Sequence, residues 1–251
     1  MKFSIIIPSY NQDNFIETTF QNLVDLKNIS KENDYELELA LFDNNSNEKV
    51  QAIIHKYKSN FDILVIGSDK GQYDAINKGI SKISGDYWTW LNTDDIIEKD
   101  GFLEIVKYLK GHPDTDYIYG DVKVIDEAGK VLQLGTIGNI TLGALVNKDA
   151  SISQPGSFFR TEFTRKIGFL AAYKFAFDYE YILRILKNNG KVAKVNAYVS
   201  GFRYYSGSKS GSQTPVFLKE QFAISKLYGR KPFSFLTFML RLRIIKRSLF
   251  N

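Results

Sequence analysis

Residues 85–95 read Gly-Asp-Tyr-Trp-Thr-Trp-Leu-Asn-Thr-Asp-Asp, an aromatic and apolar run that ends in two adjacent carboxylates. The composition of residues 87–91 predicts a buried strand. Asp94 and Asp95 then follow its carboxyl end, the edge at which open α/β sheets bind ligands. Two neighbouring carboxylates repel each other unless a cation or hydrogen-bond donors offset their charge. A divalent ion that already holds phosphate oxygens is a suitable partner, because Mg²⁺ usually takes one or two protein carboxylates. The alternative is a helix cap after the strand.

Strand and helix patterns alternate through the first half of the chain. We expect strands at 2–8, 36–43, 61–66 and 87–91, with helices between them at 14–26, 47–57 and 73–83. This order predicts a parallel sheet with right-handed crossovers. Later segments read as a hairpin (117–134), a short strand (157–160), a helix (179–187) and extended chain (192–205). Without an internal repeat or low-complexity linker, we expect one α/β domain of two unequal halves.

Carboxylates follow three consecutive strands of this predicted sheet. Asp43 closes the second strand, Asp69 and Asp74 come after the third, and Asp94 and Asp95 come after the fourth. Parallel strands end at one edge, so these side chains should converge on one cleft although they are far apart in sequence. Capping at strand ends is a generic alternative, but three such positions in succession favour a functional site.

Composition excludes several classes of protein. The 251 residues are 44% hydrophobic and 24% charged, which is ordinary for a soluble domain. The chain has no cysteine, so disulfides and thiolate metal sites are excluded. We expect a cytoplasmic protein, because the N-terminal sequence does not resemble a signal peptide and no apolar run approaches the ~18 residues that span a bilayer.

A set of short motifs, each weak alone, occurs in order and at characteristic spacing. The set comprises residues 5–11 (Ile-Ile-Ile-Pro-Ser-Tyr-Asn), 42–46 (Phe-Asp-Asn-Asn-Ser), 69–79 (Asp-Lys-Gly-Gln-Tyr-Asp-Ala-Ile-Asn-Lys-Gly), 92–95 (Asn-Thr-Asp-Asp), 154–160 (Gln-Pro-Gly-Ser-Phe-Phe-Arg) and 178–184 (Asp-Tyr-Glu-Tyr-Ile-Leu-Arg). Over about residues 3–210 the chain resembles family 2 glycosyltransferases, which are inverting enzymes with the GT-A fold. The resemblance implies a mostly parallel central sheet with a smaller mixed acceptor-side half. It divides a single domain, 1–232, into a nucleotide-sugar-binding half (1–98) and an acceptor and catalytic half (99–232).

The resemblance also implies roles for individual residues around a UDP-sugar donor. Asp94 would face the ribose, and Asp95 would bind a divalent metal, Mn²⁺ or Mg²⁺. Pro8, Tyr10 and Asp43 would form the nucleotide-base pocket. Asp74 and Asn77 would line the donor cleft. Packing or capping roles are the alternatives for Tyr10, Asp43 and Asp74.

Asp178 matches the acidic position that the family places opposite the donor, and we expect it to be the catalytic base. Inversion in one displacement needs a single base to take the acceptor hydroxyl proton. A metal would stabilise the leaving diphosphate as a Lewis acid. Glu180 is the secondary candidate. Relatives often carry a histidine after Phe202-Arg203 that binds metal in some GT-A enzymes, but this chain has Tyr204-Tyr205. A third protein ligand is therefore left open.

Basic residues are concentrated near the C-terminus. Residues 221–251 hold seven of the 33 Lys and Arg residues and no Asp or Glu, and the remaining 26 basic residues face 28 acidic ones. The basic balance therefore does not indicate a nucleic-acid partner. Residues 233–251 form a basic apolar tail that could lie on an anionic membrane surface, pack on the domain or form a dimer contact. We expect a peripheral position on the inner face of the plasma membrane.

The sequence thus predicts a metal-dependent inverting glycosyltransferase that moves a sugar from a UDP-sugar to a saccharide or lipid-linked saccharide acceptor in cell-surface polysaccharide synthesis. One alternative is a sugar-1-phosphate nucleotidyltransferase. That enzyme would need a Gly-rich basic loop after the first strand, where this chain has Pro-Ser-Tyr-Asn-Gln at 8–12. Another is a non-catalytic nucleotide-sugar-binding module, against which the presence of Asp95 and Asp178 argues.

Overall fold

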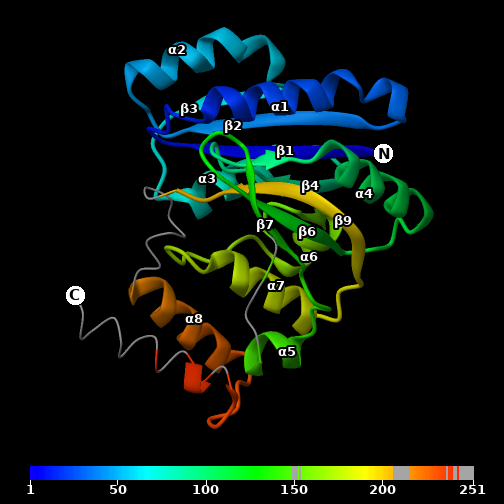
Figure 1. Cartoon of the computed structure of the whole chain (residues 1–251), viewed down its shortest axis with the longest axis vertical. Coiled ribbons are helices and arrows are strands. Elements are labelled where there is room, and N and C mark those ends of the chain that lie inside the picture. The colour runs from blue at the N-terminus through cyan, green and yellow to red at the C-terminus, as the bar shows by residue number, and fades with distance from the viewer. Residues whose placement is uncertain (149–151, 153, 206–214, 236, 240–241, 243–251) are drawn as a thin grey trace.

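The computed structural model describes residues 1–148, 152, 154–205, 215–235, 237–239 and 242. Strands and helices follow one another along the whole described chain (Figure 1). In order they are β1 (Lys2–Ser9), α1 (Ile16–Asn28), η1 (Lys31–Asn33), β2 (Glu36–Asp43), α2 (Glu48–Tyr57), η2 (Lys58–Asn60), β3 (Ile63–Ile66), α3 (Gln72–Ile80), β4 (Tyr87–Trp90), β5 (Ile96–Ile97), α4 (Lys99–Gly111), β6 (Tyr117–Ile125), β7 (Val131–Gly135), α5 (Leu142–Asn147), β8 (Ser157–Arg160), α6 (Thr161–Ile167), α7 (Phe177–Lys187), β9 (Val192–Arg203) and α8 (Pro215–Leu227).

One sheet joins the two halves of the chain, in the order β3-β2-β1-β4-β8-β6-β9-β5, with β7 paired to β6. The pairs among the first four strands are parallel, as the sequence predicts. β8 then runs antiparallel to both β4 and β6, and β6 pairs in parallel with β9. The predicted combination of a parallel half and a smaller mixed half is confirmed. Because β1 lies between β2 and β4, the carboxyl ends of these three strands meet at one edge.

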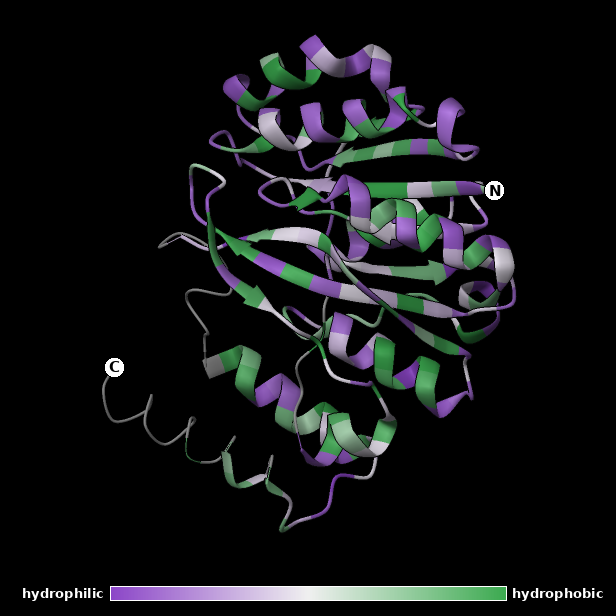
Figure 2. Cartoon of the chain, turned by 45° about the vertical axis from the view of Figure 1, so that its right-hand side comes forward, coloured by the Kyte–Doolittle hydropathy of each residue, from purple (hydrophilic) through white to green (hydrophobic). Residues whose placement is uncertain are grey.

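Helices cover both faces of the sheet (Figure 1). On one face, α1, α2 and α4 contribute Phe20, Ile54 and Phe102 to an apolar cluster with β1 and β2. On the other face, α3 and α7 contribute Ile76 and Leu183 to a second cluster. Hydrophilic and hydrophobic residues alternate along the two helices at the top of Figure 2, α1 and α2, as expected for helices with one buried face.

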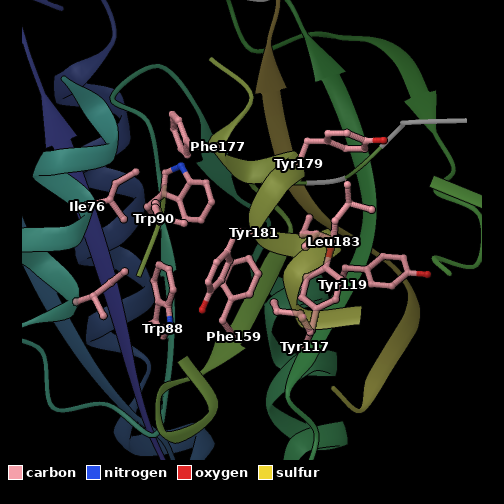
Figure 3. Packing of buried hydrophobic residues seen from close by; sticks show 14 of the residues in the cluster. Ile76, Trp88, Trp90, Tyr117, Tyr119, Phe159, Phe177, Tyr179, Tyr181 and Leu183 are labelled. Atoms are coloured by element: carbon pink, nitrogen blue, oxygen red, sulfur yellow. The ribbon is translucent and has the colours of Figure 1, made fainter. Parts of the chain in front are cut away.

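The second cluster is built around stacked aromatic side chains (Figure 3). The ring of Phe159 on β8 lies 5.8 Å from Trp90 and 5.2 Å from Tyr117, with interplanar angles of 10° and 11°. Tyr181 on α7 meets Phe159 edge-on at 5.3 Å. These contacts pack α7 against β4 and β8. The N-terminus of α7, which carries Asp178, is thereby placed over the sheet.

Some elements had no clear signal in the sequence. β5 is two residues long, and it exists because Ile96 and Ile97 pair with Gly201 and Ser200 of β9. α4 packs closely on β9 because Gly101 has no side chain, and a Cβ there would lie 2.0 Å from the carbonyl oxygen of Tyr198.

Within the described residues, no helix is long and apolar enough to span a bilayer.

The tail expected over 233–251 is only partly described. Its residues 236, 240–241 and 243–251 lie outside the described residues. In the part that is described, four large apolar side chains are exposed, while Met239 is partly buried: the exposed ones are Phe233, Phe235, Phe238 and Leu242.

Candidate active site

A cavity of about 670 Å³ opens at the carboxyl ends of β1 and β4. Its lining comes from both halves of the chain. The first half contributes the end of β1, the start of α3 and the segment after β4, and the second half contributes β9, α7 and α8. Residues that line it include Pro8, Tyr10, Gln12, Asp69, Trp90, Asn92, Asp94, Gln154, Lys174, Phe175, Phe177, Asp178, Arg203, Tyr205 and Phe217. The predicted convergence of strand ends on one cleft thus holds for Asp69 and Asp94.

Four of the predicted site residues line the cavity: Pro8, Tyr10, Asp94 and Asp178. Tyr10 is 63% exposed although it carries a large ring, so that ring is available to a ligand. Its position follows from the turn after β1, where Asn11 has a φ of 51°. Asparagine tolerates this left-handed conformation better than most residues.

Asp43 ends β2 but does not line the cavity, and it is only 1% exposed. Its Oδ1 accepts hydrogen bonds from the Ser46 N–H at 2.9 Å and Gln51 Nε2 at 2.6 Å. Its Oδ2 accepts from the Ser9 hydroxyl at 2.8 Å and the Ser46 hydroxyl at 2.5 Å. All four acceptor positions of the carboxylate are therefore occupied by protein donors. A contact with a nucleotide base would require one donor, such as Gln51, to move.

Asp74 and Asn77 on α3 also lie outside the cavity lining. Asp74 accepts from the Lys70 N–H and pairs with Lys78, each at 3.0 Å. Burial opposes its ionisation, but these donors outweigh the burial and lower the pKa of Asp74. The Asn77 amide exchanges two hydrogen bonds of 2.9 Å with the backbone of Leu170. Both side chains hold α3 and its surroundings in place.

Asp94 and Asp95 differ sharply in environment. Asp94 lines the cavity, whereas Asp95 does not and is 1% exposed. Asp95 Oδ1 accepts from the Arg203 N–H at 2.9 Å, and its Oδ2 accepts from Asn92 Nδ2 at 3.1 Å. Burial and the charge of Asp94 outweigh these bonds and raise the pKa of Asp95 well above its usual value. Asp95 therefore links the loop after β4 to β9, and Asp94 forms part of the cavity wall.

Three further residues at this end of the cavity were not predicted. Tyr205 donates its hydroxyl to Asp94 Oδ2 at 3.0 Å, and Gln12 Nε2 donates to the Tyr205 oxygen at 2.5 Å. Arg203 is 3% exposed and donates from Nε to the Asp94 carbonyl oxygen at 2.9 Å. The only signal in the sequence was the Tyr-Tyr pair after Phe202-Arg203, at the position where a metal-binding histidine was sought. The contacts themselves join residues more than 100 positions apart.

Asp178 lies in the first turn of α7 and contributes to the cavity wall. Its Oδ1 accepts from the Tyr179 N–H at 2.7 Å. Burial raises the pKa of Asp178 to about 6, because the nearby backbone N–H groups offset only part of the desolvation and Glu220 adds a like charge. At neutral pH this carboxyl is mostly ionised, yet it is a stronger base than an exposed aspartate.

Glu180, the secondary candidate for the base, does not line the cavity. Arg184 donates to both of its carboxylate oxygens, and the Tyr228 hydroxyl donates to Oε1 at 2.6 Å. Arg184 also donates to the Phe169 carbonyl oxygen at 2.6 Å. Glu180 is thus part of a half-buried network that connects α7 to neighbouring segments.

Two carboxylates that follow strand ends line the cavity, Asp69 after β3 and Asp94 after β4. No cluster of three or more His, Cys, Asp or Glu side chains suited to a metal exists among the described residues. Asp94 with Asn92 beside it is nevertheless a donor set of the type that Mg²⁺ uses when substrate phosphates and water complete its coordination. The residues present therefore fit an ion that arrives with a diphosphate.

The family model for glycosyl transferase family 2 matches residues 4–178. The fold and the site described above agree with this match, and the chain belongs to the family 2 glycosyltransferases. The predicted resemblance is confirmed.

Two kinds of curated relative match the chain. The poly-beta-1,6-N-acetyl-D-glucosamine synthase of Staphylococcus aureus (strain MSSA476) is 22% identical over 152 residues, which cover 60% of this chain and 35% of that protein. The chain thus matches about a third of that relative's length. A PGL/p-HBAD biosynthesis glycosyltransferase of Mycobacterium bovis (strain BCG / Pasteur 1173P2) is 25% identical over 223 residues, 86% of this chain and 82% of that protein.

Solved structures establish the GT-A fold. S. aureus TarS 1-349 in complex with UDP-GlcNAc superposes with a TM-score of 0.70 at 18% identity, over 91% of this chain and 66% of that one. The mannosyltransferase PcManGT from Pyrobaculum calidifontis, in complex with GDP-Man and Mn²⁺, gives a TM-score of 0.67 at 15% identity, over 96% and 68% of the two chains.

Proposed function

We propose that this protein transfers a sugar from a UDP-sugar to a hydroxyl group of a saccharide or lipid-linked saccharide, with inversion at the anomeric carbon. The observation that carries this proposal is that Asp94 and Asp178, from different halves of the chain, line one cavity. Asp94 lies where a nucleotide-diphosphate would enter, at the carboxyl ends of the parallel strands. Asp178 brings a base with a raised pKa into the same space.

The donor would bind against residues 1–98. Pro8 and the exposed ring of Tyr10 offer an apolar surface to the base, since aromatic rings stack favourably on flat π-systems. Asp43 would contribute by holding the turns after β1 and β2 through its bonds to Ser9 and Ser46. Asp74 and Asn77 would support the donor cleft from behind. UDP as the nucleotide is supported by the UDP-GlcNAc complex of the TarS neighbour.

Asp178 would act as the general base on the acceptor side, within residues 99–232. The acceptor hydroxyl gives its proton to an Asp178 carboxylate oxygen as its own oxygen attacks the anomeric carbon. The bond between that carbon and the diphosphate oxygen breaks, and UDP leaves with the electron pair. One base and one displacement account for inversion.

A divalent cation, Mn²⁺ or Mg²⁺, would neutralise charge that develops on the leaving diphosphate. Of the adjacent pair Asp94 and Asp95, only Asp94 lines the cavity, so we assign it the contact with the ion. Asp95, the ligand expected from the sequence, would first have to give up hydrogen bonds to Arg203 and Asn92. We propose instead that Asp95 fixes the backbone on which Asp94 stands.

The acceptor and the setting are inferred from the relatives' names and from the C-terminal residues. A poly-beta-1,6-N-acetyl-D-glucosamine synthase and a PGL/p-HBAD biosynthesis glycosyltransferase among the relatives support a role in cell-surface polysaccharide synthesis. Phe233, Phe235 and Phe238 are exposed, and residues 221–251 are basic without any acidic residue. This composition supports a tail that holds a cytoplasmic enzyme on the anionic inner face of the membrane.

A panel of UDP- and GDP-sugars with Mn²⁺ or Mg²⁺ tests the function through two readouts, nucleotide release and thermal shift. A transferase releases UDP in the presence of a saccharide acceptor, and Asp178→Asn abolishes the release. A sugar-1-phosphate nucleotidyltransferase would instead release pyrophosphate from UTP and a sugar phosphate. A binding module would give a thermal shift without release with every acceptor tried.

A further inference from the structure

Helix α8 holds the segment that leads into α7 through a single side chain. Glu220 Oε1 accepts from the Lys174 N–H at 2.9 Å, and its Oε2 accepts from the N–H groups of Phe175 and Ala176 at 2.9 and 3.0 Å. Ala176 is the N-cap residue of α7 and has no side-chain oxygen with which to cap the helix. Glu220 therefore accepts, from another helix, the N–H groups of the N-cap residue and of the two residues before it.

The three residues that Glu220 holds lie directly beside the proposed reaction site. Lys174, Phe175 and Phe177 line the cavity, and Asp178 follows them in the first turn of α7. α8 itself adds Phe217 to the lining. A displacement of this segment would therefore move the cavity wall and the base together.

α8 has a second, separate anchor on α7. The Tyr228 hydroxyl, one residue beyond α8, donates to Glu180 Oε1 at 2.6 Å, and the Lys187 ammonium lies 5.3 Å from the centre of the Tyr228 ring. Ile224 on the buried side of α8 belongs to the apolar cluster under α7. The helix is thus fixed to α7 independently of Glu220, which leaves the Glu220 carboxylate as a specific contact to the segment before the base.

We propose that Glu220 is a positioning residue for sugar transfer, which holds in place the backbone of the segment directly before Asp178. This inference rests on the proposed role of Asp178. Among the described residues, the titratable side chains coupled to Asp178 by charge are Glu220 on α8 and Tyr117 on β6. The Glu220 charge raises the pKa of Asp178, and the Asp178 charge in turn raises that of Tyr117. Replacing Glu220 by Gln should lower the pKa of Asp178 and leave at least one of the three N–H groups without an acceptor, because the amide keeps only one oxygen.

The experiment compares Glu220→Gln with two variants of the same region. Lys219→Gln changes an exposed neighbour on α8, and Tyr228→Phe removes the other anchor. The Asp178 carboxyl is titrated by ¹³C NMR, with its resonance assigned from Asp178→Asn, and amide exchange is followed at residues 174–176. We expect Glu220→Gln alone to lower the Asp178 pKa by ~0.5 or more and to speed exchange of at least one of the three amides by ~10-fold or more. Lys219→Gln and Tyr228→Phe should leave the Asp178 pKa and the amide exchange unchanged, although Tyr228→Phe lowers Tm.

Transfer kinetics give a further readout where a donor and an acceptor have been found. Glu220→Gln should lower kcat by ~10-fold and move the acidic limb of its pH profile downwards, with the UDP Kd within twofold of wild type. If Glu220→Gln lowers only Tm and leaves the NMR titration and amide exchange as in Lys219→Gln, Glu220 is merely structural and the inference is wrong.

Two further measurements separate the inference from loss of folding and from failure of the proposed function. Glu220→Asp, which keeps the charge on a shorter side chain, replaces Glu220→Gln if the latter does not fold. It should speed amide exchange at 174–176 while retaining most of the Asp178 pKa, and unchanged exchange would overturn the inference. A wild type without transferase activity refutes the function, whereas the titration and exchange results still decide whether Glu220 holds this segment.

Discussion

The Tyr205 hydroxyl donates to Asp94 Oδ2 across 3.0 Å and so joins the end of β9 to the loop after β4. Burial, together with the charge of Asp94, raises the pKa of Tyr205 to about 12. The hydroxyl is therefore protonated at neutral pH and remains a donor to the carboxylate. Tyr205 stands near the position where the sequence suggested that a histidine ligand was missing. We infer that it orients Asp94, since a protonated phenol is a poor ligand for a divalent ion.

Exchanging Asp94 and Asp95 for asparagine, one at a time, should separate their roles. Asp94→Asn should abolish the Mn²⁺-dependent part of the UDP thermal shift and weaken UDP binding by ~10-fold or more, because it removes the one carboxylate of this pair that lines the cavity. Asp95→Asn should retain the metal-dependent shift but lower Tm, because Asp95 serves backbone and side-chain donors in the interior. The opposite pattern would restore Asp95 as the metal ligand.

Replacing Glu180 tests the alternative base. Glu180→Gln should reduce stability by about 1–3 kcal/mol, because the Arg184 guanidinium loses its buried carboxylate partner. Turnover per folded molecule should stay within about threefold of wild type, since the side chain does not line the cavity. Chemical denaturation and kcat, measured on one preparation, check both halves of this expectation. A loss of kcat as large as that of Asp178→Asn would make Glu180 the base.

The regular parts of the fold followed from local sequence patterns. The range 36–43 was predicted for β2 and observed as Glu36–Asp43, and 157–160 was predicted for β8 and observed as Ser157–Arg160. These segments combine apolar runs with clear ends, so local chemistry decides them. β5 and the antiparallel insertion of β8 between β4 and β6 depend on partners far along the chain, and no local pattern reports such pairing.

The sequence predicted only those site residues that lie at strand ends or within recognisable motifs. The pairing of Asp94 with Asp95 was visible in the sequence, but their separation into a cavity carboxylate and a buried one depends on Arg203 of β9. Glu220 had no signal at all, because its three donors are backbone groups more than 40 residues away. Tertiary hydrogen bonds of this kind decide which acidic residues remain available to a ligand.

Thr164 on α6 should be a sensitive point in the aromatic core. Its Oγ1 accepts from Trp88 Nε1 at 2.7 Å and from the Tyr181 hydroxyl at 2.8 Å. Thr164→Val preserves the shape but leaves two buried donors without their acceptor, which should cost about 2–4 kcal/mol. Thr164→Ser keeps the oxygen and serves as the control, with a loss of roughly 1 kcal/mol for the methyl group. Urea denaturation of both variants checks the difference, and equal losses would contradict it.

Deleting residues 233–251 tests the proposed membrane contact. Full-length protein should co-sediment with anionic vesicles at low salt and less so as salt rises, because screening weakens the attraction of the basic residues. The truncated protein should stay in the supernatant while it keeps the UDP thermal shift. If full-length protein ignores anionic vesicles at low salt, the tail has a packing or dimer role instead.

Asp178→Asn distinguishes a catalytic base from a helix cap. As the base, Asp178 must be ionised, so wild-type kcat should rise with pH through about 6 and then level off. Asn cannot accept the proton, and kcat should fall by on the order of 10²–10⁴ with a nearly unchanged donor Kd.

The stability of Asp178→Asn at different pH values is an independent test of the same role. The pKa of Asp178 in the folded protein, about 6, lies above its ordinary value of 3.8, so ionisation of Asp178 opposes folding. This cost is absent below pH ~4, grows as pH rises to ~6, and is fully present above that. Asp178→Asn should therefore raise the free energy of unfolding at pH 8 by up to about 3 kcal/mol, and Tm with it. At pH 4 it should change both quantities little. A cap would give the reverse, with a loss of about 1 kcal/mol at pH 8 and near-normal turnover. Melting temperature at the two pH values, kcat and donor Kd together decide between the two roles.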